Sequence, residues 1–535
     1  MGVSASERFG FGHYSSNVAF KLAKIRGKSP LEVANELVEK LNATSDKYFS
    51  KIEAVAPGFV NFWLKPEIFQ KELAVILKQK DKYGKNNNLK GQKIMVDYTD
   101  PNPFKEFHIG HLMSNAIGES LCQIFEWNGA KVVRVCYQGD VGLHVAKTIW
   151  GILQDKTSFP KDSAELSEKI AFLGKVYVLG SQKYEDNASA AEEIKEINKK
   201  VFDRSDKEIN HLYEKGKKWS FEHFDEVYER LGTKFDHFIL ESSVVSDGEK
   251  IVRDFLKKGI FEESEGAVVF KGEKYGLHTR VFISSQGLPT YETKDIGLAK
   301  KKMNLEKGLT SSLIVTANEQ NAYFQVVFKT MEFIFPEYAK ISKHIGHGML
   351  RFASGKMSSR IGNIITAESL IEEVEKMVEE KIAEQKLSEK EQKEIKEAVS
   401  IGAIKYSILR QAIGGDIIFD FEKSISFEGD SGPYLQYAHT RAKSVLEKAK
   451  VGKVKASLKL MPNDVSEVET MLCRFSEIVE RAGKEQAPHY IATYLIELAR
   501  IFNAYYAKFK IVDAKDEYSP YKVALTSAFT QVMKS

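Results

Sequence analysis

The middle of the chain alternates short apolar runs with an amphipathic stretch. Residues 93–96 and 131–137 are apolar runs of strand length, and the segment between them carries apolar side chains at helical spacing. Asn128 and Gly129 suit the end of that helix, because glycine readily adopts the left-handed conformation of a helix cap. The pattern predicts a strand, a loop, a helix and a parallel strand, which is the repeating unit of an α/β sheet.

Strand-like and helical patterns return later in the chain. Four further runs have the composition of strands: residues 267–270, 279–283, 312–316 and 344–350. A helical pattern over 323–335 separates the last two, and we expect the four runs to form a second βαβ half of the same sheet. The residues between the two halves are rich in lysine, glutamate and alanine at helical spacing, which predicts a mostly helical insertion over 151–265.

The two ends of the chain differ from this α/β middle, which would occupy residues 86–365. Residues 1–85 combine helical spacing with alternation on both sides of a Pro-Gly turn, which predicts a small α+β domain. A strongly charged helical region follows the middle at residues 366–400. Residues 401–535 show only amphipathic helical segments separated by Gly, Pro or acidic breaks, so we expect a separate all-α bundle.

Composition adds few limits to this picture. The 535 residues suffice for several domains, and the formal net charge of +4 permits nucleic-acid binding without arguing for it. The three cysteines, Cys122, Cys136 and Cys473, lie far apart, so we expect no protein-bound metal, no disulfide and a reducing, cytoplasmic setting. No run approaches the roughly 18 apolar residues of a membrane span, so we expect no membrane partner.

Two short motifs carry the candidate chemistry. The sequence His-Ile-Gly-His at 108–111 stands where the first helix would begin, and the unpaired N–H groups and positive dipole end of a helix favour phosphate binding. Its two imidazoles can add side-chain donors to the same phosphate. The second motif, at residues 355–363, is a Gly- and Ser-rich loop with the cation Lys356, placed after the last predicted strand.

In this order, on opposite halves of an interrupted parallel sheet, the motifs resemble the HIGH and KMSKS signatures of class I aminoacyl-tRNA synthetases. The resemblance implies a Rossmann-like catalytic domain. Attack of a carboxylate on the α-phosphate of ATP builds negative charge, which fixed imidazole and ammonium donors are suited to stabilise. A second His-Ile-Gly-His, at 344–347, leads into no helix, so we expect its histidines to be structural residues on a strand.

Within class I, nearly the whole chain resembles the arginyl-tRNA synthetase family. The match is carried by residues 96–111, 291–295, 319–321 and 426–439. The resemblance implies an arginine-binding set of Asn102, Tyr291, Asp295 and Gln320. It implies an ATP-binding set of His108, Gly110, His111, Lys356, Met357, Ser358 and Ser359. The residues implied to be catalytic are Lys105, His108, His111 and Lys356.

Two of the assignments that the resemblance implies also fit the residues present. Lys105 matches a lysine that in the family replaces the missing second lysine of KMSKS, and Ser359 stands at that position here. A carboxylate at Asp295 is a natural bidentate acceptor for a guanidinium. The resemblance also implies that the N-terminal domain binds tRNA and that the C-terminal bundle binds the anticodon.

Two departures from the family pattern accompany the match. The loop 139–144 differs from the family's usual sequence, so Asp140 and His144 are only possible substrate-site residues. Met113 replaces an arginine that frequently follows HIGH.

The function implied by the resemblance is ATP-dependent activation of L-arginine to arginyl-adenylate, followed by transfer to the 3′-terminal ribose of tRNA(Arg). ATP with Mg²⁺ would be a substrate, no tightly bound cofactor is expected, and tRNA would have to bind before the adenylate forms. We expect a cytoplasmic monomer. Two alternatives remain open: another class I synthetase, chiefly the cysteine enzyme, which would need a zinc site, and a catalytically silent homologue that only binds RNA.

Overall fold

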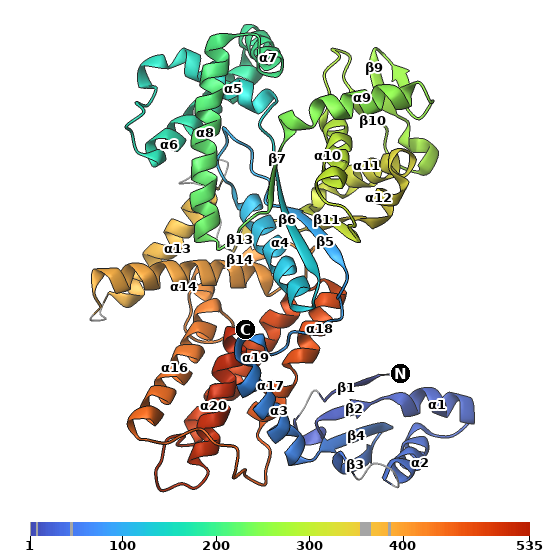
Figure 1. Cartoon of the computed structure of the whole chain (residues 1–535), viewed down its shortest axis with the longest axis vertical. Coiled ribbons are helices and arrows are strands. Elements are labelled where there is room, and N and C mark those ends of the chain that lie inside the picture. The colour runs from blue at the N-terminus through green and yellow to red at the C-terminus, as the bar shows by residue number, and fades with distance from the viewer. Residues whose placement is uncertain (1, 7–8, 43–46, 354–364, 384–386) are drawn as a thin grey trace.

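The computed structural model shows a central sheet with two lobes on one side and a helical bundle on the other, and the N-terminal domain lies beside that bundle (Figure 1). The structure describes residues 2–6, 9–42, 47–353, 365–383 and 387–535. Among the helices in these ranges, none is both long and apolar enough to cross a membrane. The mixed α/β architecture with helical and α+β flanks agrees with the prediction.

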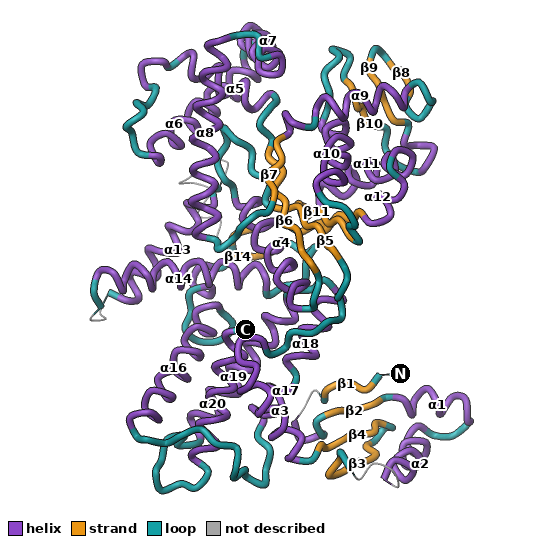
Figure 2. Tube along the Cα trace, in the orientation of Figure 1, coloured by secondary structure: helices purple, strands orange, loops and turns teal. Residues whose placement is uncertain are grey.

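The central sheet consists of β5 (Lys93–Tyr98), β6 (Lys131–Gln138), β7 (His237–Leu240), β11 (Ser311–Ala317) and β12 (Ser342–His347). All neighbours pair in parallel, in the order β12-β11-β5-β6-β7. Figure 2 shows β5, β6, β7 and β11 gathered at the centre of the molecule. The predicted pairing of the first two strands is therefore confirmed. The chain winds outward from β5 to β7 and then, on the other side, from β11 to β12. Ligands of open α/β sheets bind at the carboxyl ends of the strands, next to such a reversal.

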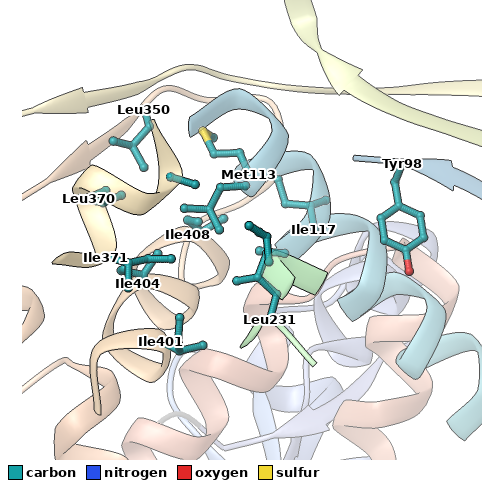
Figure 3. Packing of buried hydrophobic residues seen from close by; sticks show 14 of the residues in the cluster. Tyr98, Met113, Ile117, Leu231, Leu350, Leu370, Ile371, Ile401, Ile404 and Ile408 are labelled. Atoms are coloured by element: carbon teal, nitrogen blue, oxygen red, sulfur yellow. The ribbon is translucent and has the colours of Figure 1, made fainter. Parts of the chain in front are cut away.

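The helix α4 (Ile109–Trp127) connects β5 to β6, as its apolar spacing predicts. Its residues Met113 and Ile117 share a buried cluster with Ile404 and Ile408 of α14 (Glu389–Leu409) (Figure 3). Met113 is 1% exposed, so this position serves the packing between the sheet domain and the helices that follow it.

A helical insertion follows β6, as predicted, and it leads into β7. It consists of α5 (Leu143–Gln154), α6 (Leu166–Asp186), α7 (Ala188–Asp203) and α8 (Lys207–Arg230). The helices α5 and α6 approach each other closely because each has a glycine at the crossing. A Cβ atom on Gly180 of α6 would stand 2.1 Å from the Lys147 carbonyl oxygen, and one on Gly151 of α5 would stand 2.3 Å from that of Val176.

We expect Gly180→Ala to destabilise the insertion by about 2 kcal/mol, because the obstructing atom is backbone and the helices have to separate. Thermal unfolding measures this as a lower melting temperature. The matched control is Gly415→Ala, where an added Cβ meets nothing within 4 Å. A Gly180→Ala protein that melts like the control would contradict the close crossing.

The two predicted strands at 267–270 and 279–283 exist, but their expected place in the sheet was wrong. After α9 (Val245–Leu256), the strands β8 (Glu262–Ser264), β9 (Ala267–Phe270) and β10 (Arg280–Ile283) form a separate antiparallel sheet. Only β11 and β12 belong to the second half of the central sheet. An apolar run shows that a strand is half or fully buried, and it does not identify the strand's partner.

The prediction also missed an edge strand, because β7 lies inside the range assigned to the mostly helical insertion. This strand has only four residues and pairs with one neighbour, β6. Its last residue leads into a 3₁₀ turn, η4 (Glu241–Ser243), at the carboxyl edge of the sheet. The helices that complete this half are α10 (Tyr291–Leu305), α11 (Asn321–Ile334) and α12 (Pro336–Ile341).

The N-terminal domain has the predicted α+β composition. Its strands β1 (Val3–Ala5), β2 (Tyr14–Ser16), β3 (Phe49–Val55) and β4 (Phe59–Leu64) form an antiparallel sheet in the order β1-β2-β4-β3, packed with α1 (Val18–Arg26) and α2 (Pro30–Asn42). Ser29 caps α2 through reciprocal hydrogen bonds with Glu32. The next helix, α3 (Pro66–Gln79), leaves this domain and shares a buried cluster with the C-terminal helices.

The C-terminal part contains α13 (Ala367–Ile382), α14, α15 (Phe421–Ser424), α16 (Gly432–Val451), α17 (Glu467–Cys473), α18 (Phe475–Glu485), α19 (His489–Lys508) and α20 (Ser519–Lys534). The expectation of helix alone beyond residue 401 was wrong at one place. The strand β14 (Ile417–Phe419) pairs in parallel with β13 (Leu350–Phe352), which precedes the second motif. Three residues are too few for a periodic signal, and their partner lies far away in the sequence.

Candidate active site

The two histidines of the first motif form the entrance of α4. His108 is the N-cap, and its Nδ1 accepts a hydrogen bond from the Gly110 N–H at 3.1 Å. The His108 N–H donates to Nδ1 of His111 at 3.2 Å, so the two side chains complete a reciprocal capping box. Their rings are stacked with 3.5 Å between centroids. The predicted position of this motif at a helix start is confirmed.

These hydrogen bonds determine which ring nitrogens remain available. Burial, with help from the Lys105 cation, lowers the pKa of His108 to about 4, and burial lowers the pKa of His111 well below its usual value. Both rings are therefore neutral at physiological pH. Because each Nδ1 accepts a hydrogen bond, each ring carries its proton on Nε2. The entrance therefore holds two fixed Nε2–H donors beside the positive end of the helix dipole.

Lys105 lies in the loop between β5 and α4. This loop contains residues with positive φ, at Thr99, Asp100 and Phe104, and such a backbone persists only where its surroundings hold it. The Thr99 N–H donates to the Ser114 hydroxyl, and the Phe104 N–H donates to the Ser220 hydroxyl, both at 2.9 Å. The Lys105 ammonium lies 5.3 Å from the centre of the Tyr177 ring on α6. The loop thus holds a cation on the histidine side of the sheet edge.

The second group of predicted residues begins α10. Asp295 lies one turn after Tyr291, and its Oδ2 accepts a hydrogen bond from the Tyr323 hydroxyl at 2.6 Å. Burial raises the pKa of Asp295 to about 7, although the Tyr323 bond and the Lys302 cation act in the opposite direction. Within the part of the chain that the structure describes, this carboxylate forms no ion pair. Tyr291 is 59% exposed.

The remaining predicted arginine contacts come from two different strand ends. Gln320 ends the 3₁₀ turn η6 (Asn318–Gln320), directly after β11. Asn102 lies in the loop after β5, and its Oδ1 is so near Gly139 that a Cβ there would meet it at 2.2 Å. A side chain at 139, which follows β6, would therefore displace the Asn102 amide from this position.

Sequence reasoning missed a buried ion pair beside these residues. Lys294 on α10 donates to Glu241 at 2.6 Å, and both side chains are about 5% exposed. The Glu241 carboxylate also lies near Gly139, and the Lys294 ammonium is 4.5 Å from the centre of the Tyr291 ring. Glu241 follows the unpredicted strand β7, so the sequence offered no local signal for it.

The two candidate residues in the loop after β6, Asp140 and His144, form hydrogen bonds with other groups of the protein. Asp140 is fully buried, and its oxygens accept hydrogen bonds from the Tyr213 hydroxyl and from the N–H and hydroxyl of Ser242. Nε2 of His144 donates to the Gly139 carbonyl at 2.7 Å, and burial lowers the pKa of His144 to about 3. These bonds show how the loop is shaped. They leave any contact with substrate a prediction.

The second His-Ile-Gly-His lies on β12, as predicted. His344 bonds to Thr316 through Nε2 and to Asn321 through Nδ1, and His347 is buried with Nδ1 against the Gly348 carbonyl. These bonds fit a structural role for the pair.

The second motif cannot be placed in the same way. Its predicted residues Lys356, Met357, Ser358 and Ser359 lie outside the described residues. The chain is described again from Ile365, whose carbonyl accepts the N–H of Ile109 at 3.1 Å, at the entrance of α4. Among the residues that the structure does describe, no group of three or more His, Cys, Asp or Glu side chains could hold a metal ion.

Family comparisons match the chain in three segments. Residues 3–64 match the model described as "Arginyl tRNA synthetase N terminal domain", residues 72–421 match "tRNA synthetases class I (R), catalytic domain", and residues 435–535 match "DALR anticodon binding domain". The arginine–tRNA ligases of Clostridium perfringens and Clostridium acetobutylicum are each 31% identical to it over 524 residues, which span 96% of this chain and 90% of theirs.

Solved structures have the same fold. The arginyl-tRNA synthetase of Thermus thermophilus superposes with a TM-score of 0.78 at 23% identity, covering 99% of this chain and 93% of that one. The arginyl-tRNA synthetase of Plasmodium falciparum gives a TM-score of 0.73 at 20% identity, with the same coverage.

Proposed function

The chain belongs to the arginyl-tRNA synthetase family of class I. We propose that two groups of residues at the carboxyl edge of its central sheet bind the two small substrates. One group, formed by Asn102, Tyr291, Asp295, Gln320 and the newly found Glu241, would bind arginine. The other, formed by Lys105, His108, Gly110, His111 and the second motif with Lys356, Met357, Ser358 and Ser359, would bind ATP.

One observation carries this division. Asp295 is a carboxylate at the sheet edge that no described cation neutralises, whereas Glu241 beside it already has Lys294. Such a site favours a ligand that brings its own positive charge and several N–H donors, which describes a guanidinium. A site whose buried groups hydrogen-bond a guanidinium rejects amino acids that lack one. A separate editing site that removes wrong products is therefore not needed.

The residues proposed to bind ATP are suited to stabilise a developing negative charge. When the arginine carboxylate attacks the α-phosphate of ATP, pyrophosphate leaves and charge builds on the phosphate oxygens. The Nε2–H donors of His108 and His111 are held in place before the reaction, so they can stabilise this charge without reorganising. Lys105 would supply the second cation that Ser359 does not, and Mg²⁺ would arrive with ATP.

The flanking domains extend the proposal to tRNA. The N-terminal α+β domain and the C-terminal helices would hold tRNA(Arg), whose terminal ribose then accepts the arginyl group. Action as a cytoplasmic monomer stays a prediction. Pyrophosphate exchange with each amino acid, with and without tRNA(Arg), tests the proposal. Exchange with arginine that requires tRNA supports it, and exchange with cysteine, or none with arginine and tRNA together, refutes it.

The raised pKa of Asp295 predicts how arginine binding depends on pH. Below about pH 7 the free enzyme holds this carboxyl protonated, and the guanidinium needs it ionised. Arginine therefore has to displace a proton, and its KM should rise by up to about tenfold for each pH unit below that value. Kinetics between pH 6 and 8.5 measure this. A KM for arginine that stays flat over that range would show that another group governs binding.

A further inference from the structure

Tyr137, near the carboxyl end of β6, has a side-chain hydroxyl that forms no hydrogen bond with the described residues. Its hydroxyl oxygen is inaccessible to solvent. Its backbone N–H, in contrast, donates to Asp100 at 2.8 Å and fixes the residue to the loop that carries Asn102. A buried hydroxyl without a partner is costly, and native proteins rarely keep one without a use for it.

Strand geometry determines where this hydroxyl points. The neighbours Cys136 and Gln138 both reach Tyr228 on α8, at 3.5 and 3.4 Å. Successive strand residues face opposite sides of a sheet, so Tyr137 faces away from α8. There its ring packs with the cluster that contains Val244 and Leu298.

That cluster places the Tyr137 ring next to the two elements that carry the carboxylates of the arginine group. Leu298 follows Asp295 by three residues on α10 and therefore shares its helix face, and Val244 directly follows the turn that begins with Glu241. Burial, followed by the Glu241 and Asp295 charges, raises the pKa of Tyr137 well above its usual value. The phenol is therefore neutral at physiological pH.

We propose that the Tyr137 hydroxyl is a further specificity-determining contact, which accepts an N–H of the arginine side chain. This inference rests on the proposed function. A guanidinium has five N–H donors and no acceptor, and Asp295 already accepts the Tyr323 hydroxyl, so the proposed site needs acceptors besides Asp295. A neutral hydroxyl adds an acceptor without adding another buried charge.

The test is Tyr137→Phe, which keeps the packed ring and removes only the hydroxyl. We expect the KM for arginine to rise about ten- to hundredfold, the loss typical of a hydrogen bond to a charged group, with kcat and the KM for ATP nearly unchanged. Inhibition by agmatine, which keeps the guanidinium and lacks the carboxylate, should weaken by the same factor. The melting temperature should not fall, because the removed hydroxyl has no partner in the free protein.

The matched control is Tyr228→Phe, a buried tyrosine on the other side of β6 whose hydroxyl already bonds to Cys136 and Gln138. It should leave the KM for arginine unchanged. An unchanged KM in Tyr137→Phe overturns the inference, and so does a change for arginine without one for agmatine, because the hydroxyl would then contact the other end of the substrate. A wild-type protein without arginine-dependent exchange would instead refute the proposed function.

Discussion

Replacing Asp295 with asparagine raises the KM for arginine by at least about a hundredfold and leaves the KM for ATP nearly unchanged. The reason is that the guanidinium loses its only uncommitted carboxylate in the described site, and truncating one partner of a buried charge pair typically costs 2–5 kcal/mol. The residues proposed to bind ATP include the entrance of α4 and the loop before it, so they should keep their contacts. Steady-state pyrophosphate exchange with tRNA(Arg), varying each substrate in turn, measures the two constants.

Asp295→Asn should also affect arginine binding and protein stability in different directions. Burial raises the pKa of Asp295 from 3.8 to about 7, so the ionised carboxyl destabilises the free fold increasingly from about pH 4 upward and fully above pH 7. Asparagine removes this cost and keeps an oxygen for the Tyr323 hydroxyl. The melting temperature at pH 8 should therefore stay the same or rise while arginine binding is lost. A parallel loss of stability would mean that Asp295 acts mainly as a structural residue.

Asp247→Asn is the matched control, because this carboxylate also contacts α10, pairing with Lys300 at the surface. Exposed pairs contribute little, and this one lies outside the proposed site, so the KM for arginine should not change. An equal rise in both variants would show that movement of α10, and not loss of the Asp295 charge, causes the effect.

The parts of the fold that could be predicted from sequence are those whose information is local. The β5–α4–β6 unit has apolar runs, helical spacing and a glycine cap in consecutive order, and each of these constrains the backbone by itself. His108 was recognisable because its place before an amphipathic run is a property of neighbouring residues. Asp295 needed a family resemblance, since one acid in the first turns of a helix is most often only a favourable interaction with the dipole.

The parts that could not be predicted depend on pairing across the chain. The strands β9 and β10 have the same apolar character as β11, and only their partners show that they form a separate sheet. β7 has only four residues, which are too few to show the alternation of a strand. Without that strand, the sequence offered no reason to place Glu241 at the edge of the sheet. Tyr137 was visible as part of a strand, but its unpartnered hydroxyl follows from packing against α10, which the sequence does not specify locally.

The largest effect on the chemical step is expected at His108. Two substitutions distinguish the role of Nδ1, which caps α4, from that of Nε2, the proposed phosphate donor. His108→Asn keeps an acceptor for the Gly110 N–H, because asparagine is a good N-cap, and it removes the Nε2–H donor. We expect kcat to fall about a hundred- to thousandfold, the cost of one preorganised donor to a charged transition state, while the KM for ATP changes little. Single-turnover formation of arginyl-adenylate in the presence of tRNA measures this step directly.

His108→Gln makes the opposite change. Its side-chain amide can place an N–H near the position of Nε2, but it offers no acceptor at the position of Nδ1, so the helix entrance loses its cap. This variant should keep more of the adenylation rate than His108→Asn and should be less stable by about 1 kcal/mol. A rate that falls equally in both variants would assign the effect to the capping bond. A full rate in His108→Asn would mean that the Nε2–H of His108 does not contact the reacting phosphate, and that His111 and the lysines suffice.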